Sequence, residues 1–261
     1  MSEDILYEIK NRVATITLNR PERKNAFTLP LIHRWADLLI QANSDDTVRV
    51  IVVTGAGGAF CAGVDLDALA AIDPSALSRR DFLTDEIHRV ARAVEMSDKP
   101  IIAAVSGAAI GAGMDMALMC DMRIVAESAR FAESYINIGL VPGDGGAYYL
   151  PRLVGVAKAL ELLLTGDTVT GAQAVALGMA NTVVPDSELM DYTQALAERI
   201  AAKAPIAVKL IRRSVYQSQD VDLRTALDLV ASHMGVIMTT NDHKEALAAF
   251  REKRPGNFLG K

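Results

Sequence analysis

Two segments of the chain repeat one design: an apolar strand, a turn of glycine and alanine, and the start of a helix. They are VVTGAGGAFCAGVD, residues 52–65, and AVSGAAIGAGMD, residues 104–115. Small residues let a ligand approach the backbone, and a helix start presents N–H groups without helical partners. Two such turns at one pocket would direct two N–H donors at one oxygen, forming an oxyanion hole. The alternative is tight packing of strands against helices.

Asp115 lies in an almost wholly small or apolar run, AIGAGMDMALMCD, residues 109–121. A carboxylate in such surroundings is costly unless it is paired, hydrogen-bonded or protonated. Burial also raises its pKa toward the range in which a carboxyl group transfers protons. We therefore predict a functional acid at Asp115; the alternative is a cap of its own helix start. Asp121 is interpreted as structural, with Arg123 or a backbone amide as its partner.

The order of the elements favours an α/β fold of stacked β-β-α units. Residues 5–9 and 13–18 predict a hairpin. Thr28 is a candidate cap for a helix, and a further helix is expected over 85–96. Three short apolar runs are typical of strands that are buried on both faces of a sheet. They are VRVIVVTG (48–55), KPIIAAVSG (99–107) and CDMRIVAE (120–127).

From about Val156 the pattern is helical almost to the end of the chain. Thr170 is placed to cap a helix over 171–177. Pro205 is placed to open another. We expect a core over 1–195 and a helical C-terminal region over 196–261, packed on the core or on a neighbouring subunit.

The composition argues against several classes of protein. The chain has 261 residues, a net charge of −5 and no long run of Lys or Arg, which disfavours a nucleic-acid surface. Cys61 and Cys120 give neither a disulfide framework nor metal-ligand spacing, so no metal site is expected. The N-terminus lacks an apolar targeting region, and the longest weakly charged run, 100–120, is interrupted by Ser106, glycines and Asp115. We expect no membrane helix and a cytoplasmic location.

Several blocks of the sequence, in order, resemble those of the enoyl-CoA hydratase/isomerase family, the crotonase superfamily. The blocks are NRPERKNAF, GAFCAGVDL, GAAIGAGMDMALMCDMRIV, GLVPGDGGAYYLPRLVG, LTGDTVTGAQAVALGMANTVVP and the tail AFREKRPGNF. The resemblance covers essentially the whole chain. It implies a spiral of β-β-α units with a helical trimerisation region, a homotrimer or dimer of trimers, and an acyl-CoA substrate. No separate cofactor is implied, because coenzyme A enters as part of the substrate.

The resemblance also implies how the substrate is held. The two oxyanion donors would be the N–H groups of Ala62 and Ala112. Arg23 and Lys24, with the tail residues Arg251, Lys253 and Arg254, are candidates to meet the phosphates of coenzyme A. The residues expected to bind substrate are Lys24, Ala26, Cys61, Ala62, Val64, Asp65, Leu66, Gly111, Ala112, Pro142 and Gly143.

The implied acid–base groups depart from a two-glutamate hydratase. Asp115 stands where hydratases have a glutamate, and Tyr135 stands at the position of the second glutamate. Glu133, two residues earlier, would face the same side as Tyr135 in an extended segment. Asp144 lies in the turn where related enzymes place a working aspartate, most often one position earlier, at Gly143 here. Asp144 is either a displaced base or an N-cap of the next helix.

We therefore expect an enzyme that adds water to, or shifts the double bond of, an enoyl-CoA. The catalytic set is Ala62, Ala112, Asp115, Tyr135 and Asp144. One alternative is an acyl-CoA hydrolase of the same fold, for which Ser106, Asp115 and His88 form a nominal triad without the GxSxG signature. Another is a member that binds CoA thioesters but is catalytically impaired.

Overall fold

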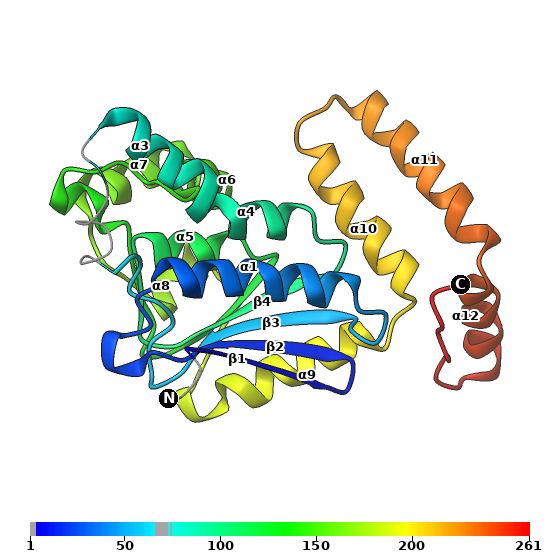
Figure 1. Cartoon of the computed structure of the whole chain (residues 1–261). Coiled ribbons are helices and arrows are strands. Elements are labelled where there is room, and N and C mark those ends of the chain that lie inside the picture. Colours follow the sequence, from blue (N-terminus) through cyan, green and yellow to red (C-terminus); the bar gives the residue numbers. More distant parts are fainter. Residues whose placement is uncertain (1–3, 66–72, 74) are drawn as a thin grey trace.

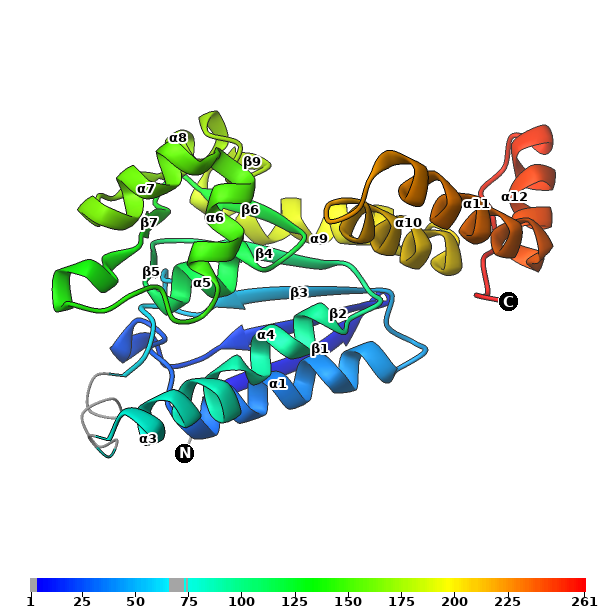
Figure 2. The same ribbon diagram turned by 90° about the horizontal axis from the view of Figure 1, so that it is seen from above.

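The computed structural model describes residues 4–65, 73 and 75–261. A six-stranded sheet with the order β1-β2-β3-β4-β6-β9 lies at its centre (Figures 1 and 2). The first pair, β1 and β2, is antiparallel, and all later neighbours are parallel. The strands are β1 (Ile5–Lys10), β2 (Val13–Leu18), β3 (Val50–Gly55), β4 (Ile101–Val105), β6 (Met122–Ala126) and β9 (Thr182–Val184).

A second, smaller sheet joins β5 (Ala108–Ile110), β7 (Arg130–Ala132) and β8 (Val169–Thr170). Single parallel bridges, Phe27 with Val64 and Cys61 with Ala109, continue this layer. Each of β3, β4 and β6 is therefore followed by a short extended segment of the second layer. The expected α/β architecture of stacked β-β-α units is confirmed.

Helices cover both faces of the large sheet, with α1 on one side and α9 on the other (Figure 1). Along β3, Ile51 and Val53 belong to the core beneath α1, whereas Val50 and Val52 belong to the core beneath α9. This double burial explains the uninterrupted apolar strand. The helices are α1 (Leu29–Ser44), α3 (Ala76–Asp81), α4 (His88–Glu95), α5 (Ala112–Leu118), α6 (Gly146–Val154), α7 (Val156–Thr165), α8 (Gly171–Ala176), α9 (Leu189–Ala201), α10 (Pro205–Ser218), α11 (Leu223–Thr239) and α12 (Asn241–Glu252).

The local predictions have mixed outcomes. Thr170 caps α8 through a complete capping box with Gln173, and Pro205 opens α10, as predicted. Thr28 is the N-cap residue of α1, but its side chain makes no capping hydrogen bond. The helix expected over 85–96 is preceded by α3 and by a π-helical turn over Phe82–Ile87.

The expectation of an almost wholly helical chain from about Val156 onward was wrong at two places. Strand β8 pairs with β7, and β9 completes the edge of the large sheet beside β6. These strands are two and three residues long. They owe their conformation to partners far away in the chain, which local periodicity does not reveal.

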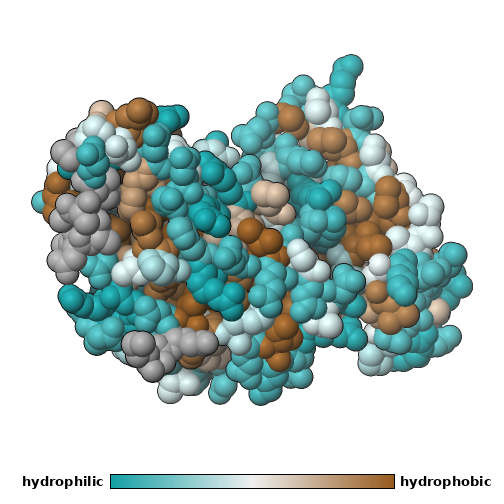
Figure 3. Space-filling model, viewed as in Figure 1, coloured by the Kyte–Doolittle hydropathy of each residue, from teal (hydrophilic) through white to brown (hydrophobic). Residues whose placement is uncertain are grey.

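Helices α10–α12 form an arm that stands apart from the body of the molecule (Figures 1 and 2). The expected boundary at 195/196 lies inside α9, which packs on the sheet, and the arm begins with α10. Apolar side chains are exposed over the arm (Figure 3). They include Leu223, Leu227, Met234, Met238, Leu247 and Phe250. None of the described helices is both long and apolar enough to cross a membrane.

Candidate active site

The loop between β2 and α1 is organised around the buried side chain of Asn25. Its amide nitrogen donates to the carbonyl oxygens of Ala56 and Ala59, at 2.9 and 2.7 Å, and its oxygen accepts from the N–H of Arg20. Lys24 and Asn25 both adopt positive φ, 49° and 57°. This places the carbonyl of Lys24 against the first glycine-rich turn and leaves the Lys24 side chain exposed.

The predicted oxyanion role of Ala62 is wrong, because its N–H group is occupied. It donates to the carbonyl of Lys24 at 2.9 Å. The two residues that flank Val64 form main-chain hydrogen bonds with Phe27. The Phe27 N–H donates to the Gly63 carbonyl, and the Phe27 carbonyl accepts from the Asp65 N–H. Because a strand residue between two such bonds points its own N–H the other way, Val64 directs its N–H away from Phe27. That N–H has no acceptor among the described residues.

The second glycine-rich turn leads directly into α5. Gly111, with φ 53°, is its N-cap residue, and Ala112 is its first residue. The N–H of Ala112 finds no acceptor in the described part of the chain. A Cβ atom on Gly63 would lie 3.4 Å from the Ala112 nitrogen. The backbone beside Val64 therefore approaches the start of α5 closely, and glycine permits the approach.

Tyr135 joins the two predicted aspartates. Its hydroxyl oxygen lies 2.8 Å from Oδ2 of Asp115 and 2.9 Å from Oδ2 of Asp144. The main-chain N–H of Asp144 also donates to Oδ2 of Asp115, at 3.1 Å. The ring of Tyr135 lies beside Gly111, 3.8 Å from the position of a Cβ there. The acids are thus brought next to the start of α5.

Neither aspartate acts as a helix cap. The N-cap residue of α6 is Gly145, which provides no side-chain hydrogen bond, and the Asp144 carboxyl group is hydrogen-bonded to the Tyr135 hydroxyl. Asp115 is likewise hydrogen-bonded to Tyr135 and accepts from the Asp144 N–H, rather than from its own helix start. The capping alternatives are therefore wrong for both residues.

Glu133 is the buried acid that sequence reasoning ranked too low. It is 1% exposed, and both carboxyl oxygens lack a hydrogen-bond donor among the described residues. It faces Asp115 across Gly146: a Cβ on Gly146 would lie 2.7 Å from Oε1 of Glu133 and closer still to Oδ1 of Asp115. The alternation of side chains along a strand could have indicated this burial, since Glu133 comes two residues after the buried Phe131 of β7.

Burial raises the pKa of every acid in this cluster. It raises the pKa of Asp144 to about 6, helped by the charge of Asp115 and opposed by the hydrogen bond from Tyr135. Burial raises the pKa of Glu133 to about 10, and the Asp115 charge adds to the rise. The pKa of Asp115 is also raised by burial, against hydrogen bonds from Glu133 and Tyr135. Tyr135 titrates far above its usual range for the same reason.

The nominal Ser106–Asp115–His88 triad does not form. Nε2 of His88 makes a 2.7 Å hydrogen bond with the carbonyl of Gly143, whereas Asp115 bonds to Tyr135. His88 therefore fixes the glycine turn that carries Asp144. A hydrolase mechanism with a serine nucleophile loses its geometric basis.

The remaining predicted binding residues fall into three groups. Cys61 packs against Gly113 at the start of α5, Gly111 lies beside Tyr135, and the Gly143 carbonyl bonds to His88. Burial raises the pKa of the Cys61 thiol to about 12. No contact of the Pro142 side chain with the described residues bears on its predicted role. Asp65 pairs with Arg20 at 3.3 Å, and Arg20 also donates to the Ala26 carbonyl at 2.5 Å, so both residues serve the loop. Leu66 lies outside the described residues.

The structure corrects two predictions about charged residues, because it shows which partners these residues have. Asp121 accepts from the Ile101 N–H, as one alternative stated, but its charged partner is Arg212, not Arg123. The Arg123 guanidinium instead donates to main-chain carbonyls such as that of Met179. In the tail, Arg254 is engaged by Glu245 at 2.6 Å and is not free to meet a ligand.

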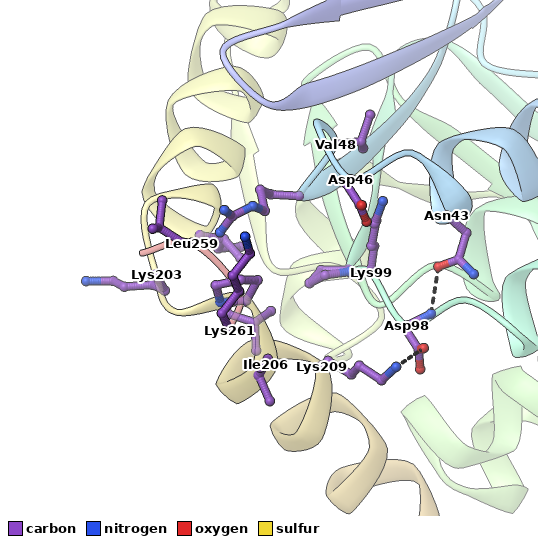
Figure 4. Close-up of a pocket in the computed structure, with 16 residues that line it drawn as sticks. Asn43, Asp46, Val48, Asp98, Lys99, Lys203, Ile206, Lys209, Leu259 and Lys261 are labelled. Atoms are coloured by element: carbon purple, nitrogen blue, oxygen red, sulfur yellow. Dashed lines mark hydrogen bonds and ion pairs between the residues drawn. The ribbon is translucent and has the colours of Figure 1, made fainter. Parts of the chain in front are cut away.

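A cavity of about 480 Å³ lies away from the acids, between the body and the arm (Figure 4). Its charged wall includes Arg49, Lys99 and Lys209, and Lys209 pairs with Asp98. No residue predicted to bind or convert substrate lines it. No cluster of three or more His, Cys, Asp or Glu side chains in the described ranges is arranged to hold a metal ion.

The spiral of β-β-α units, with buried acids where its turns meet and a helical C-terminal region, defines a crotonase-fold protein. The model of the enoyl-CoA hydratase/isomerase family matches residues 8–261. The chain belongs to this family, and it is an enzyme of the hydratase or isomerase type.

Relatives and solved structures agree over full length. The chain is 37% identical over 267 residues to the 1,2-epoxyphenylacetyl-CoA isomerase of Escherichia coli K12, covering 100% of both chains. It is 35% identical over 262 residues to a crotonyl-CoA hydratase of Syntrophomonas wolfei, covering 99% of each. The crystal structure of an enoyl-CoA hydratase from Bacillus anthracis superposes with a TM-score of 0.95 at 35% identity, covering 99% of this chain and 100% of that one.

Proposed function

We propose that the enzyme shifts the double bond of an enoyl-CoA, using Asp144 and Asp115 as one acid–base unit. The observation that carries this proposal is the Tyr135 hydroxyl, which links the two carboxyl groups at 2.8 and 2.9 Å. Linked groups titrate as a pair. A pair that exchanges one proton suits a reaction that removes a proton from one carbon and returns it to another.

The thioester oxygen is held by the N–H groups of Val64 and Ala112 in this proposal. Both N–H groups lack acceptors among the described residues, and the backbone beside Val64 approaches Ala112 closely. Preorganised donors of this kind stabilise the negative charge that develops on an enolate oxygen. Val64 replaces Ala62 as the donor from the first turn.

The reaction begins with a 3-enoyl-CoA whose thioester oxygen accepts from these two N–H groups. Oδ1 of Asp144, which has no partner within the described structure, removes a proton from C2. The electron pair of the C2–H bond then spreads over the dienolate and the thioester oxygen. The same carboxyl group returns the proton to C4, the double bond moves to C2–C3, and Asp144 is again ionised.

Hydration is the second candidate, because two relatives at 35% and 34% identity are named a crotonyl-CoA hydratase and a short-chain-enoyl-CoA hydratase. In that reaction the pair would deprotonate water for attack on C3 and protonate C2. Both candidates use the same donors and the same pair. They differ in the product.

The deciding experiment supplies 3-enoyl-CoA and 2-enoyl-CoA separately and identifies the products. Isomerisation predicts interconversion of the two enoyl thioesters without a hydroxyl product. A 3-hydroxyacyl-CoA as the main product, formed with the higher kcat/KM, would establish hydration instead. Turnover of neither substrate would favour the catalytically impaired alternative.

We also propose that the arm mediates association with further copies of the chain, as a trimer or a dimer of trimers. Its α11 exposes Leu223 at 73% and Leu227 at 60%, and Phe250 of α12 is 83% exposed. Side chains of this kind are normally covered in a subunit interface. Light scattering after gel filtration tests this, and a monomer at micromolar concentration would contradict it.

A further inference from the structure

The Glu133 carboxyl group lies where an ionised acid has no source of stabilisation. Glu133 is 1% exposed, and none of its oxygens meets an N–H or O–H donor in the described residues. The charged or titratable groups that face it are Asp115 from α5 and Asp144 from the turn before α6. Both are acids, so an ionised Glu133 would be repelled as well as desolvated.

The contacts in the cluster allow its protons to be counted. The Tyr135 oxygen contacts Asp115 and Asp144. Oε1 of Glu133 and Oδ1 of Asp115 both lie against the same side of Gly146, which brings these two carboxyl groups together. Each oxygen–oxygen contact needs one proton. The Tyr135 hydroxyl supplies one of three, so two of the three carboxyl groups are protonated. The cluster then holds a single negative charge.

We propose that Glu133 is a protonated positioning residue that donates its carboxyl hydrogen to Oδ1 of Asp115 and confines the negative charge to the Asp115–Tyr135–Asp144 unit. This inference rests on the proposed function of that unit. Its physical role is to complete the hydrogen bonds of Asp115. Oδ2 of Asp115 is already bonded to Tyr135 and to the Asp144 N–H, and Oδ1 lies near the Gly146 main chain without forming a hydrogen bond of good geometry in the described structure.

Two substitutions separate a protonated donor from the alternatives. Glu133→Gln keeps the shape and a donor but has no charge to gain, and Glu133→Leu removes the donor. A donor to the charged form of an acid lowers its pKa. The acid limb of the kcat/KM profile should therefore stay in place in Glu133→Gln. In Glu133→Leu it should move to higher pH by about 1–2 units, the equivalent of one hydrogen bond to a charged group.

The opposite outcomes would overturn the proposal. A limb that moves to lower pH in Glu133→Gln would show that Glu133 is ionised in the parent, because its removal then relieves repulsion. An unmoved limb in a folded Glu133→Leu variant would show a merely structural acid. If Glu133→Leu does not fold, the Glu133→Gln profile still decides between the charge states.

Infrared difference spectroscopy gives a readout that does not depend on turnover. At pH 8 the parent should show the carbonyl stretch of a protonated carboxylic acid that Glu133→Gln loses. Absence of that band overturns the proposal, whatever reaction the enzyme catalyses. If the band is present but the parent converts no enoyl-CoA, the proposed function fails while the protonation of Glu133 stands. The pH dependence of acyl-CoA binding in the same variants then tests the positioning role.

Discussion

The main-chain N–H of Asp144 donates a 3.1 Å hydrogen bond to the carboxylate of Asp115, which lies 29 residues earlier in the chain. This bond ties the glycine turn before α6 to the first turn of α5. Tyr135 adds a second connection between the same two residues. A substitution at either aspartate therefore disturbs a shared unit, and the two effects should not be additive.

Replacing Asp144 with asparagine should lower turnover by about 10²–10⁴ while acyl-CoA binding persists. Asparagine keeps the size of the side chain and an oxygen that can accept from Tyr135, but it cannot take up a substrate proton. The measurements are kcat/KM on the preferred enoyl-CoA and calorimetric binding of a saturated acyl-CoA. Near-parent turnover would remove Asp144 from the mechanism.

Asp115→Asn provides the comparison within the same unit. It should also lower turnover, since an amide cannot share one proton and one negative charge with Asp144 through the Tyr135 hydroxyl. The double variant should be little worse than the poorer single variant. Multiplied losses in the double variant would show two independent groups instead of one unit.

Tyr135→Phe should move the acid limb of the pH–activity profile to higher pH. The hydrogen bond from Tyr135 lowers the pKa of Asp144, which burial places at about 6. A base works only when ionised, so the parent should lose activity as the pH falls through about 6. Without the hydroxyl the pKa of Asp144 rises, and the loss should begin at higher pH. Profiles of kcat/KM between about pH 5 and 8 test this; superimposable curves would reduce Tyr135 to a lining residue.

Much of the fold was predictable because its determinants are local. The Thr170 capping box and Pro205 at the start of α10 operate within one helical turn. The apolar strand β3 is buried on both faces, which its residues alone indicate. Strand β9 was missed because three residues carry little periodicity, and their pairing with β6 spans more than 50 positions.

The residues of the site were easier to predict than their geometry. Asp115, Tyr135 and Asp144 were all selected from the sequence, and the structure brings them together. The expectation of a free Ala62 N–H failed because the direction of an N–H depends on pairing, here with the carbonyl of Lys24 in a distant loop. Local spacing carries no information on that pairing.

Ala112→Pro should reduce turnover by about 10²–10³, since it deletes one N–H donor. Proline is well tolerated at the first position of a helix, and Ala112 is the first residue of α5. Ala112→Gly is the matched control, because glycine keeps the N–H and should leave turnover nearly unchanged. Circular dichroism confirms the fold of both variants. Equal activities in Ala112→Pro and Ala112→Gly would exclude this donor.

Arg212 should be the residue that fastens the arm to the body. From α10 its Nε donates to both carboxylate oxygens of Asp121 at 2.9 and 3.0 Å, and its other nitrogens reach the carbonyls of Val94 and Ser97. The pair is about nine-tenths buried, with 11% and 12% side-chain exposure. Breaking one partner of a buried pair leaves an uncompensated charge, so Arg212→Met should cost about 3 kcal/mol of unfolding free energy.

Its neighbour Arg213 provides the control. Arg213 also pairs with an aspartate of the body, Asp98, but its side chain is 47% exposed. Solvent screens such a pair, and Arg213→Met should cost less than about 1 kcal/mol. Urea unfolding of both variants gives the difference directly. Because the arm carries the exposed apolar side chains of α11, the weaker anchorage in Arg212→Met should also reduce the assembled fraction in light scattering. Equal and small losses in the two variants would show that burial of the Asp121 pair contributes nothing to holding the arm.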